Sequence, residues 1–385
     1  MKILYVTLEP INSGSSATTC SINTIKGLLY NNHNIDILTI SRGGFYDGNR
    51  ADDIFKKCNV VCLDGKDDSK SIFQEGKSRK KEKTLKTFIK KIYRLFSPYN
   101  YSYFYLKKIN RESVSNLSKH YDMVISSSDP ITSHKAVLKL AKAGINYDYW
   151  IQYWGDPLLF DINKKCILPS FILKRLENGI LKKADKIVYL SPFTLDAQKM
   201  LYSKSAKKMV CILPPSDFTM TFNNDSNNLL DIVYFGIYYE KSRDIMPLYN
   251  AVSGDQMVSL KVAGLTDIHL ESRSNIIVSS SIPHSEALNY EFKSDVIACI
   301  LNKQGTQIPA KLYYYMNTNK QILVLYEKQN LPIVHFLEGF KRFVFSENKV
   351  EKIREAIEYL KSHRFAVPCS DLDCKHISEE IIRRI

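Results

Sequence analysis

Two cations in the second half of the chain have residue types and settings that suit a diphosphate. Arg243 ends the stretch 236–243 (GIYYEKSR), and Lys311 follows Pro309 in 307–323. A guanidinium makes bidentate contacts to phosphate oxygens, and a lysine beside the free amides of a helix start attracts anions. These residues predict an anion site. Two solvent-facing side chains are the alternative interpretation.

Three polar positions in the first half could act on a sugar or a phosphate. Gly14 and Ser15 lie in a small-residue loop, His134 lies at a helix start, and Asp156 follows an apolar run in a Gly-Asp-Pro turn. Loop amides can approach a ligand, and a helix N-terminus lowers a histidine pKa. Each position also has a structural alternative, namely a helix cap, a packing residue and a turn residue.

Alternating apolar runs and helical stretches must position these residues. The chain opens with strand, small-residue loop, helix and strand at 3–8, 9–16, 17–30 and 35–40. This βαβ unit predicts a parallel sheet, and nearly continuous apolar runs indicate strands covered on both faces. In the first half we expect further strands at 60–63, 123–126, 149–154, 187–190 and 210–213, and helices at 133–143, 171–183 and 193–202.

A polar linker follows Pro214 and Pro215, and the alternation then restarts. We expect an N-terminal domain over 1–215, a linker over 216–230, a C-terminal domain over 231–365 and a C-terminal helix over 366–385. In the second half we expect strands at 232–235, 260–263, 276–279, 296–301, 322–326 and 343–345, and helices at 285–292, 309–316, 332–339 and 350–362. Ligands of such sheets bind at the carboxyl ends of strands.

Composition sets the class of protein. The chain has 385 residues, a net charge of +14 and 44% hydrophobic residues, which excludes a disordered chain, a collagen-like repeat and a coiled-coil rod. No apolar run approaches the roughly 18 residues of a membrane-spanning helix, and the start is too short for a signal peptide. We therefore expect a cytoplasmic protein whose eight cysteines are reduced thiols.

The stretch 77–94 carries nine basic residues and one acid, so it supplies +8 of the net charge. Apolar residues recur within it at helical spacing, and an aromatic run follows at 99–105. One apolar face backed by cations is typical of contact with anionic headgroups, so we expect an anionic membrane surface over 77–105. The alternatives are a plain amphipathic helix and, with less support, nucleic acid, which we do not expect as a partner.

Taken together, these blocks resemble a GT-B glycosyltransferase of the large retaining family 4 type. The resemblance spans nearly the whole chain. It rests on 1–40, on 122–143 with 150–157, on 176–191 (LENGILKKADKIVYLS), on 232–243 and on 307–323 (QIPAKLYYYMNTNKQIL).

The resemblance implies two Rossmann-like, doubly wound parallel-sheet domains facing a cleft, with a C-terminal helix. The C-terminal domain would bind a nucleotide-sugar, as co-substrate and with no other cofactor, and the N-terminal domain the acceptor. Arg243 and Lys311 would hold the donor diphosphate without a metal, with His134 and Asp156 near the reacting carbon. These four residues form the implied catalytic set. The implied donor contacts are Gly14, Ser15, Gly236, Tyr238, Arg243, Lys311 and Tyr314.

The sequence departs from the family at its paired glutamates, which fall at Thr306 and Tyr314. We expect an enzyme that transfers a sugar from a nucleotide-sugar to a saccharide, lipid-linked in our interpretation, during surface polysaccharide or lipopolysaccharide (O-antigen) assembly. Such an enzyme would work at the inner face of the plasma membrane as a peripheral protein. The alternative is a catalytically inactive GT-B-like partner of a glycosyltransferase complex. A nucleotide-cofactor oxidoreductase is disfavoured because the GxGxxG fingerprint is missing.

Overall fold

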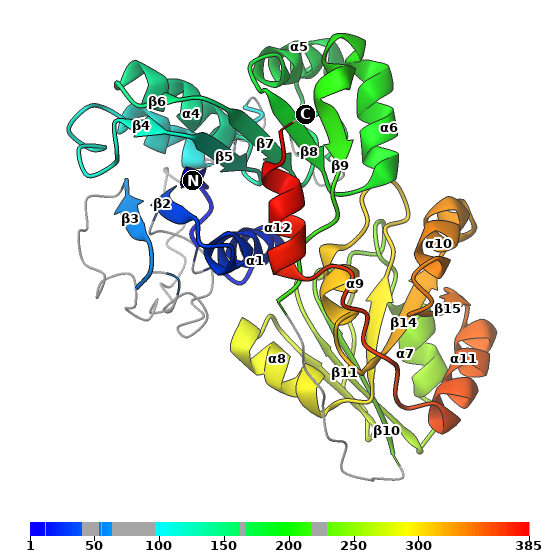
Figure 1. The fold of residues 1–385 in the computed structure, drawn as a ribbon. Coiled ribbons are helices and arrows are strands. Elements are labelled where there is room, and N and C mark those ends of the chain that lie inside the picture. The colour runs from blue at the N-terminus through cyan, green and yellow to red at the C-terminus, as the bar shows by residue number, and fades with distance from the viewer. Residues whose placement is uncertain are drawn as a thin grey trace, which may run out of the picture. The chain divides into compact units, whose positions relative to one another are not determined.

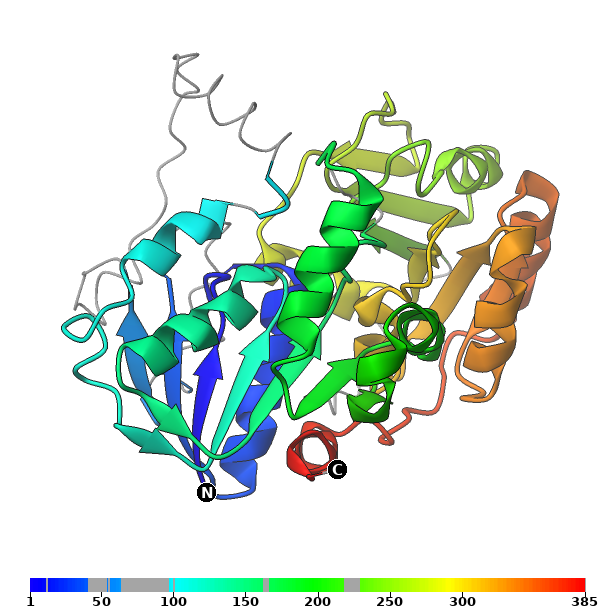
Figure 2. The same ribbon diagram turned by 90° about the horizontal axis from the view of Figure 1, so that it is seen from above.

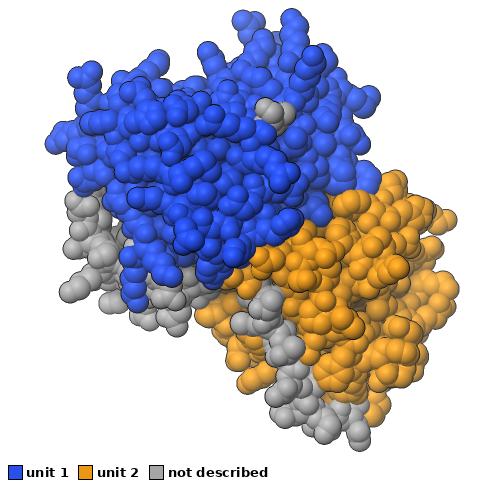
Figure 3. Space-filling view, in the orientation of Figure 1, with its two compact units in different colours: residues 1–215, 374–385 blue, residues 216–373 orange. Residues whose placement is uncertain are grey.

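The computed structural model describes residues 1–11, 13–40, 54, 56–63, 97–99, 101–161, 166–217 and 229–384. These residues form two compact units (Figure 3). Unit 1 comprises Met1–Pro215 and Cys374–Ile385, and unit 2 comprises Ser216–Asp373. Where the chain enters and leaves unit 2, Ser216 and Asp373 pair as a parallel bridge. The basic stretch 77–94 and residues 218–228 of the expected linker lie outside the described residues.

Unit 1 is built on a parallel sheet of seven strands in the order β3-β2-β1-β5-β7-β8-β9 (Figure 1). Strands β5 and β7 are buried along their whole length, as nearly continuous apolar runs predict. The strands are β1 (Lys2–Val6), β2 (Asn34–Thr39), β3 (Asn59–Cys62), β5 (Met123–Ser127), β7 (Trp150–Trp154), β8 (Lys186–Tyr189) and β9 (Met209–Cys211). A separate pair joins β4 (His120–Tyr121) to β6 (Asn146–Tyr147).

Helices cover both faces of this sheet. From β1 the chain moves to β2 on one side, and from β5 it moves to β7 on the other. Right-handed crossovers therefore place α1 and α4 on opposite faces, as Figure 2 shows. The helices are α1 (Ser16–Tyr30), α4 (Thr132–Lys142), α5 (Ser170–Leu181), α6 (Pro192–Leu201) and α12 (Cys374–Ile382), with 3-10 turns η1 (Tyr101–Lys107) and η2 (Ser203–Lys208).

Helix α12 returns from the end of the chain and packs on α1. The two helices touch at Gly27, where a Cβ atom would lie 1.9 Å from Ser378 Oγ and 2.0 Å from the carbonyl oxygen of Cys374. A glycine is required here because any side chain would separate the helices. The final helix is therefore part of unit 1.

Unit 2 is a second parallel sheet, of six strands in the order β12-β11-β10-β13-β14-β15. The strands are β10 (Leu230–Phe235), β11 (Val258–Ala263), β12 (Ile276–Ser279), β13 (Val296–Ile300), β14 (Gln321–Tyr326) and β15 (Val344–Glu347). The helices are α7 (Met246–Val252), α8 (His284–Lys293), α9 (Ala310–Tyr315), α10 (Leu331–Glu338) and α11 (Val350–Ser362), with the 3-10 turn η3 (Lys328–Asn330). The predicted class, two parallel-sheet α/β domains, is confirmed, whereas α7 was not anticipated.

The described residues also bear on two expectations from composition, which concern membrane-spanning helices and the state of the cysteines. Within the described part of the chain, no helix is both long enough and apolar enough to cross a membrane. None of the eight cysteines, all of which lie in the described part of the chain, forms a disulfide bond.

Candidate functional site

In unit 1 the predicted residues gather at the carboxyl edge of three adjacent strands, β1, β5 and β7. The loop with Gly14 and Ser15 follows β1, His134 lies in α4 after β5, and Asp156 follows β7. In a parallel sheet all carboxyl ends meet at one edge, so residues far apart in sequence converge there.

The loop after β1 is organised by its serines. Ser15 is the N-cap of α1, and its hydroxyl accepts a hydrogen bond from the backbone N–H of Thr18 at 3.1 Å. Ser13 donates to the Glu9 carboxylate at 3.0 Å. Gly14 is exposed. The capping interpretation of Ser15 is therefore observed, and ligand contact by this loop stays a prediction.

His134 is completely buried and held by a chain of hydrogen bonds. Trp150 Nε1 donates to Ser126 Oγ at 2.8 Å, and Ser126 Oγ lies 2.8 Å from His134 Nδ1. The indole can only donate, so Ser126 Oγ accepts from it, and the direction of the Ser126–His134 hydrogen bond follows from which ring nitrogen carries the proton. Nε2 has no partner among the described atoms, and the ring lies 4.4 Å from that of Trp154.

Burial lowers the pKa of His134 to about 3, so the ring is neutral at physiological pH. The direction agrees with the sequence expectation, but the cause differs, because we attributed the shift to the helix N-terminus. A neutral imidazole can donate one hydrogen bond and accept another without carrying charge.

Carboxylates that sequence reasoning missed lie near Asp156. Desolvation by the surrounding protein raises the pKa of Asp129 well above its ordinary value, and the charges of Asp156, Asp161 and Glu9 raise it further. The Asp129 residue itself keeps contact with solvent. Carboxylates in such a group can accept hydrogen bonds from sugar hydroxyls, and a raised pKa favours the protonated form of Asp129. The sequence feature that could have identified these carboxylates is their position after the ends of predicted strands.

In unit 2 the two predicted cations converge on the carboxyl ends of the adjacent strands β10 and β13. Lys311 Nζ donates to the carbonyl oxygen of Phe235, the last residue of β10, at 2.8 Å. Arg243 Nε donates to Asn302 Oδ1 just beyond β13 at 2.7 Å. Both charges act on the thiol of Cys299, whose pKa burial raises to about 12 while the two cations oppose the shift.

Asn302 is a residue of this edge that sequence reasoning missed. It is buried, and its carbonyl oxygen accepts from Asn330 Nδ2 at 2.9 Å. An ion pair between Lys303 and Asp244, 3.6 Å apart, joins the same two loops. A hydrogen bond and an ion pair therefore hold the loop that carries Arg243 against the end of β13.

The remaining predicted donor residues differ in their surroundings. At Gly236 a Cβ atom would meet nothing within 4 Å, so the backbone is open on that side, whereas at Gly264 it would lie 1.7 Å from the Gly236 carbonyl oxygen. Tyr238 is 1% exposed and Tyr314 is 5% exposed, and Tyr238 belongs to the hydrophobic core. Contact of these residues with a donor stays a prediction.

Among the described residues, the group suited to a metal ion is His120, Asp122 and Asp148, whose ligand atoms lie within 4.8 Å of one another. Asp122 precedes β5 and Asp148 precedes β7. The group therefore lies at the amino ends of these strands, away from the edge that carries His134 and Asp156.

Comparison with solved structures identifies the architecture. Anabaena Alr3699/HepE in complex with UDP and glucose aligns over 99% of this chain and 98% of that chain, with TM-score 0.59 and 11% identity. A glycosyltransferase from Rickettsia africae ESF-5 covers 99% and 92% (TM-score 0.55, 15% identity), and an alpha-glucosyltransferase with UDP and DNA covers 99% and 94% (0.53, 12%). The chain has the GT-B fold. No family model matches it, and no curated protein matches it in sequence.

In the GT-B fold each of the two units presents one carboxyl edge. In this chain the edge of unit 1 carries a buried neutral histidine and a group of carboxylates, and the edge of unit 2 carries two cations. The two edges thus differ in charge and in the chemistry available to a ligand.

Proposed function

We propose that the chain is a glycosyltransferase that transfers a sugar from a nucleotide-sugar to a saccharide acceptor. The observation that carries the proposal is the convergence of Arg243 and Lys311 at the ends of β10 and β13. A GT-B protein with two cations at this edge has what a nucleoside diphosphate requires.

The proposed chemistry follows from charge. As the glycosidic bond of the donor breaks, the diphosphate leaving group gains negative charge. Arg243 and Lys311 stabilise this charge, so their contribution is larger in the transition state than in the ground state. Two fixed cations can serve this role without a metal ion. Retention of configuration remains part of the proposal through the resemblance to family 4.

Unit 1 is proposed to bind the acceptor. Its carboxylates can accept hydrogen bonds from sugar hydroxyls, and Asp156 is the predicted member of that group. His134 is neutral, and its Nε2 has no partner among the described atoms.

A UDP-sugar is the first donor to test, because similar structures contain UDP or UDP and glucose. The acceptor is proposed to be a lipid-linked saccharide of surface polysaccharide or lipopolysaccharide assembly. The +8 charge of 77–94 supports work at an anionic membrane surface. Substitution of Lys90, Lys91 and Arg94 by Glu is expected to weaken binding to anionic liposomes at low salt. Unchanged binding would remove this support.

The second candidate function, an inactive partner subunit, is raised by Tyr314 at a position where the family has glutamate. Arg243 and Lys311 argue against this alternative, because a protein that binds no nucleotide-sugar donor would not require two cations at one strand edge.

The test is a thermal-shift panel with UDP, GDP, dTDP, CMP and NAD at millimolar concentration. A ligand at about a hundred times its Kd adds roughly 2.7 kcal/mol to the free energy of unfolding. We expect a shift with one nucleoside diphosphate that is lost in Arg243→Ala and kept in Arg354→Ala, whose side chain is exposed on α11. No shift with any nucleotide would favour the inactive partner, and a shift with NAD alone would refute the transferase.

A further inference from the structure

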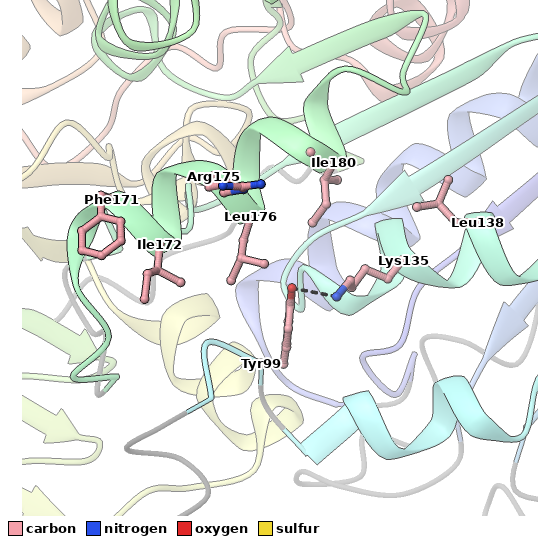
Figure 4. Close-up of a pocket in the computed structure, with 9 residues that line it drawn as sticks. Tyr99, Lys135, Leu138, Phe171, Ile172, Arg175, Leu176 and Ile180 are labelled. Carbon is pink, nitrogen blue, oxygen red and sulfur yellow. Dashed lines mark hydrogen bonds between the residues drawn. The ribbon is translucent and has the colours of Figure 1, made fainter.

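Unit 1 has an apolar groove between α4 and α5 that the proposed chemistry does not use. It has a volume of about 510 Å³, within the range of about 300–1,000 Å³ usual for ligand sites. Figure 4 shows Tyr99 and Lys135 on one side and residues of α5 on the other. The groove is lined by Tyr99, Lys135, Leu138, Phe171, Ile172, Arg175, Leu176, Gly179 and Ile180.

The walls are hydrocarbon, which suits a chain rather than a sugar. Leu138, Ile172, Leu176 and Ile180 supply aliphatic surface, and Phe171 is 72% exposed beside them. A sugar ring needs several polar partners, and this lining offers few. Exposed apolar surface of this kind marks a place where a partner molecule binds.

Two cations lie in the same groove. Lys135 Nζ donates to Tyr99 Oη at 2.7 Å and lies 4.0 Å from the centre of that ring, and Tyr99 stacks on Tyr103. Within the described residues, no carboxylate pairs with Lys135 or Arg175. Burial lowers the pKa of Lys135, which is the response of a cation that lacks a counter-charge.

The two helices as a whole are cationic. Helix α4 (TSHKAVLKLAK) has no acidic residue, and the single acid of α5 (SFILKRLENGIL) is the buried Glu177. The surface around the groove therefore favours an anion next to an apolar chain.

The groove also reaches the carboxyl edge of the sheet. Lys135 lies in the first turn of α4, and Phe171 and Ile172 lie in the first turn of α5. Each helix follows the carboxyl end of a strand, so these first turns lie at the edge that carries His134 and Asp156. Leu138, Gly179 and Ile180 continue the groove away from that edge.

We propose that this groove binds the apolar chain of a lipid phosphate, with the phosphate held by Lys135 and Arg175. The assignment of this lipid to the acceptor rests on the proposed transferase function, whereas the binding itself does not. A saccharide joined to the phosphate would then lie at the edge with Asp129 and Asp156.

The first test is calorimetric titration with hexyl, octyl and decyl phosphate below their micellar concentrations. Each pair of methylene groups that enters the groove is expected to raise the affinity about 15-fold, until the groove is full. Affinity independent of chain length would overturn the proposal, because only the phosphate would then be recognised.

Gly179 permits a sharper test, because a Cβ atom there would meet no atom within 4 Å and would enter the groove. Gly179→Trp is expected to lower octyl phosphate affinity at least about 30-fold, and Gly179→Ala less than about threefold. Glycine is a poor helix former, so neither change opposes the helix. Full affinity in a folded Gly179→Trp protein would refute the site.

The phosphate end is tested with Arg175→Gln, expected to lower octyl phosphate affinity about tenfold and octanol affinity hardly at all. Lys174→Gln, an exposed neighbour outside the groove, is the matched control and should leave both affinities unchanged. An equal loss for octyl phosphate and octanol would contradict the assigned cation.

Two measurements separate the proposals. Binding of octyl phosphate without a thermal shift from any nucleotide would support the lipid-phosphate groove and reject the proposed transferase function. A nucleotide shift without octyl phosphate binding would reject the groove proposal alone. Sedimentation of wild type and Gly179→Trp tests whether a second copy of the chain occupies the groove instead. A dimer that is lost on this substitution would overturn the proposal that the groove binds a lipid phosphate.

Discussion

Arg243 donates from Nε to the side-chain oxygen of Asn302 across 2.7 Å, joining the loop after β10 to the end of β13. The Asn302 side chain that accepts this hydrogen bond is buried, so it restricts the orientation of the guanidinium. Asn302 is therefore a positioning residue for Arg243. A cation that stabilises a leaving group must be held in place before the bond breaks, since reorganisation would cost part of its effect.

Asn302→Ala is expected to lower kcat by about 10- to 100-fold with a smaller change in KM, because Arg243 would lose its orientation. Asn302→Asp keeps the accepting oxygen and should restore most of the rate. The double variant with Arg243→Ala should be no slower than Arg243→Ala alone. Additive losses in this cycle would show that Asn302 acts independently of Arg243.

Arg243→Ala and Lys311→Ala are each expected to lower turnover of a nucleotide-sugar at least about a hundredfold, the scale of one lost transition-state contact. Steady-state kinetics with the nucleotide that stabilises the protein would measure it. Arg354→Ala on the surface of α11 is the matched control. Rates near wild type in both variants would remove the donor site from unit 2.

The sequence could predict which residues reach the strand ends, because parallel strands place all their carboxyl ends at one edge. Apolar runs located β10 and β13 well enough to place Arg243 and Lys311 together. The same argument brought His134 and Asp156 to the edge of unit 1. The parallel-sheet α/β class needed only the order of strands and helices, whereas the grouping of Arg243 with Lys311 and of His134 with Asp156 was implied by the resemblance.

Long-range partners could not be predicted in this way. Asn302 follows a strand and resembles any turn residue, and its bond to Arg243 joins residues 59 apart in sequence. Asp129 precedes a proline and reads as turn chemistry, and its raised pKa depends on neighbours from other loops. Helix α7 is short and has a proline in its first turn, so its apolar pattern is too brief to recognise.

We expect the ionisation of Glu177 to make the free energy of unfolding depend on pH. Burial raises its pKa to about 7 from an ordinary 4.5. Between these values the folded protein keeps a proton that the unfolded chain has lost. The free energy of unfolding therefore falls as pH rises through this window, by ~3 kcal/mol for this group.

Glu177→Gln should remove this term, because the amide is neutral throughout and can still accept from Tyr202 and from the Leu159 N–H. Urea unfolding at pH 4.5 and pH 7.5 would measure it. The exposed Glu112→Gln is the control. An unchanged difference between the two pH values in Glu177→Gln would contradict the raised pKa.

The end of the chain is held by one buried lysine. Lys186 of β8 donates from Nζ to the carbonyl oxygens of Glu380, Ile381 and Arg383, at 2.9, 3.0 and 2.9 Å. The last carbonyls of a helix have no partner within the helix, so this ammonium caps α12.

Lys186→Met keeps most of the apolar side-chain volume and removes the donors. We expect a loss of about 2–3 kcal/mol in the free energy of unfolding, because the capped carbonyls lose a charged partner. Hydrogen exchange should rise first in α12 and in the facing part of α1, where Gly27 allows the close approach. Lys183→Met, exposed just before β8, should change neither quantity. If exchange in α12 stays at its wild-type rate in Lys186→Met, packing on α1 rather than the lysine holds the helix.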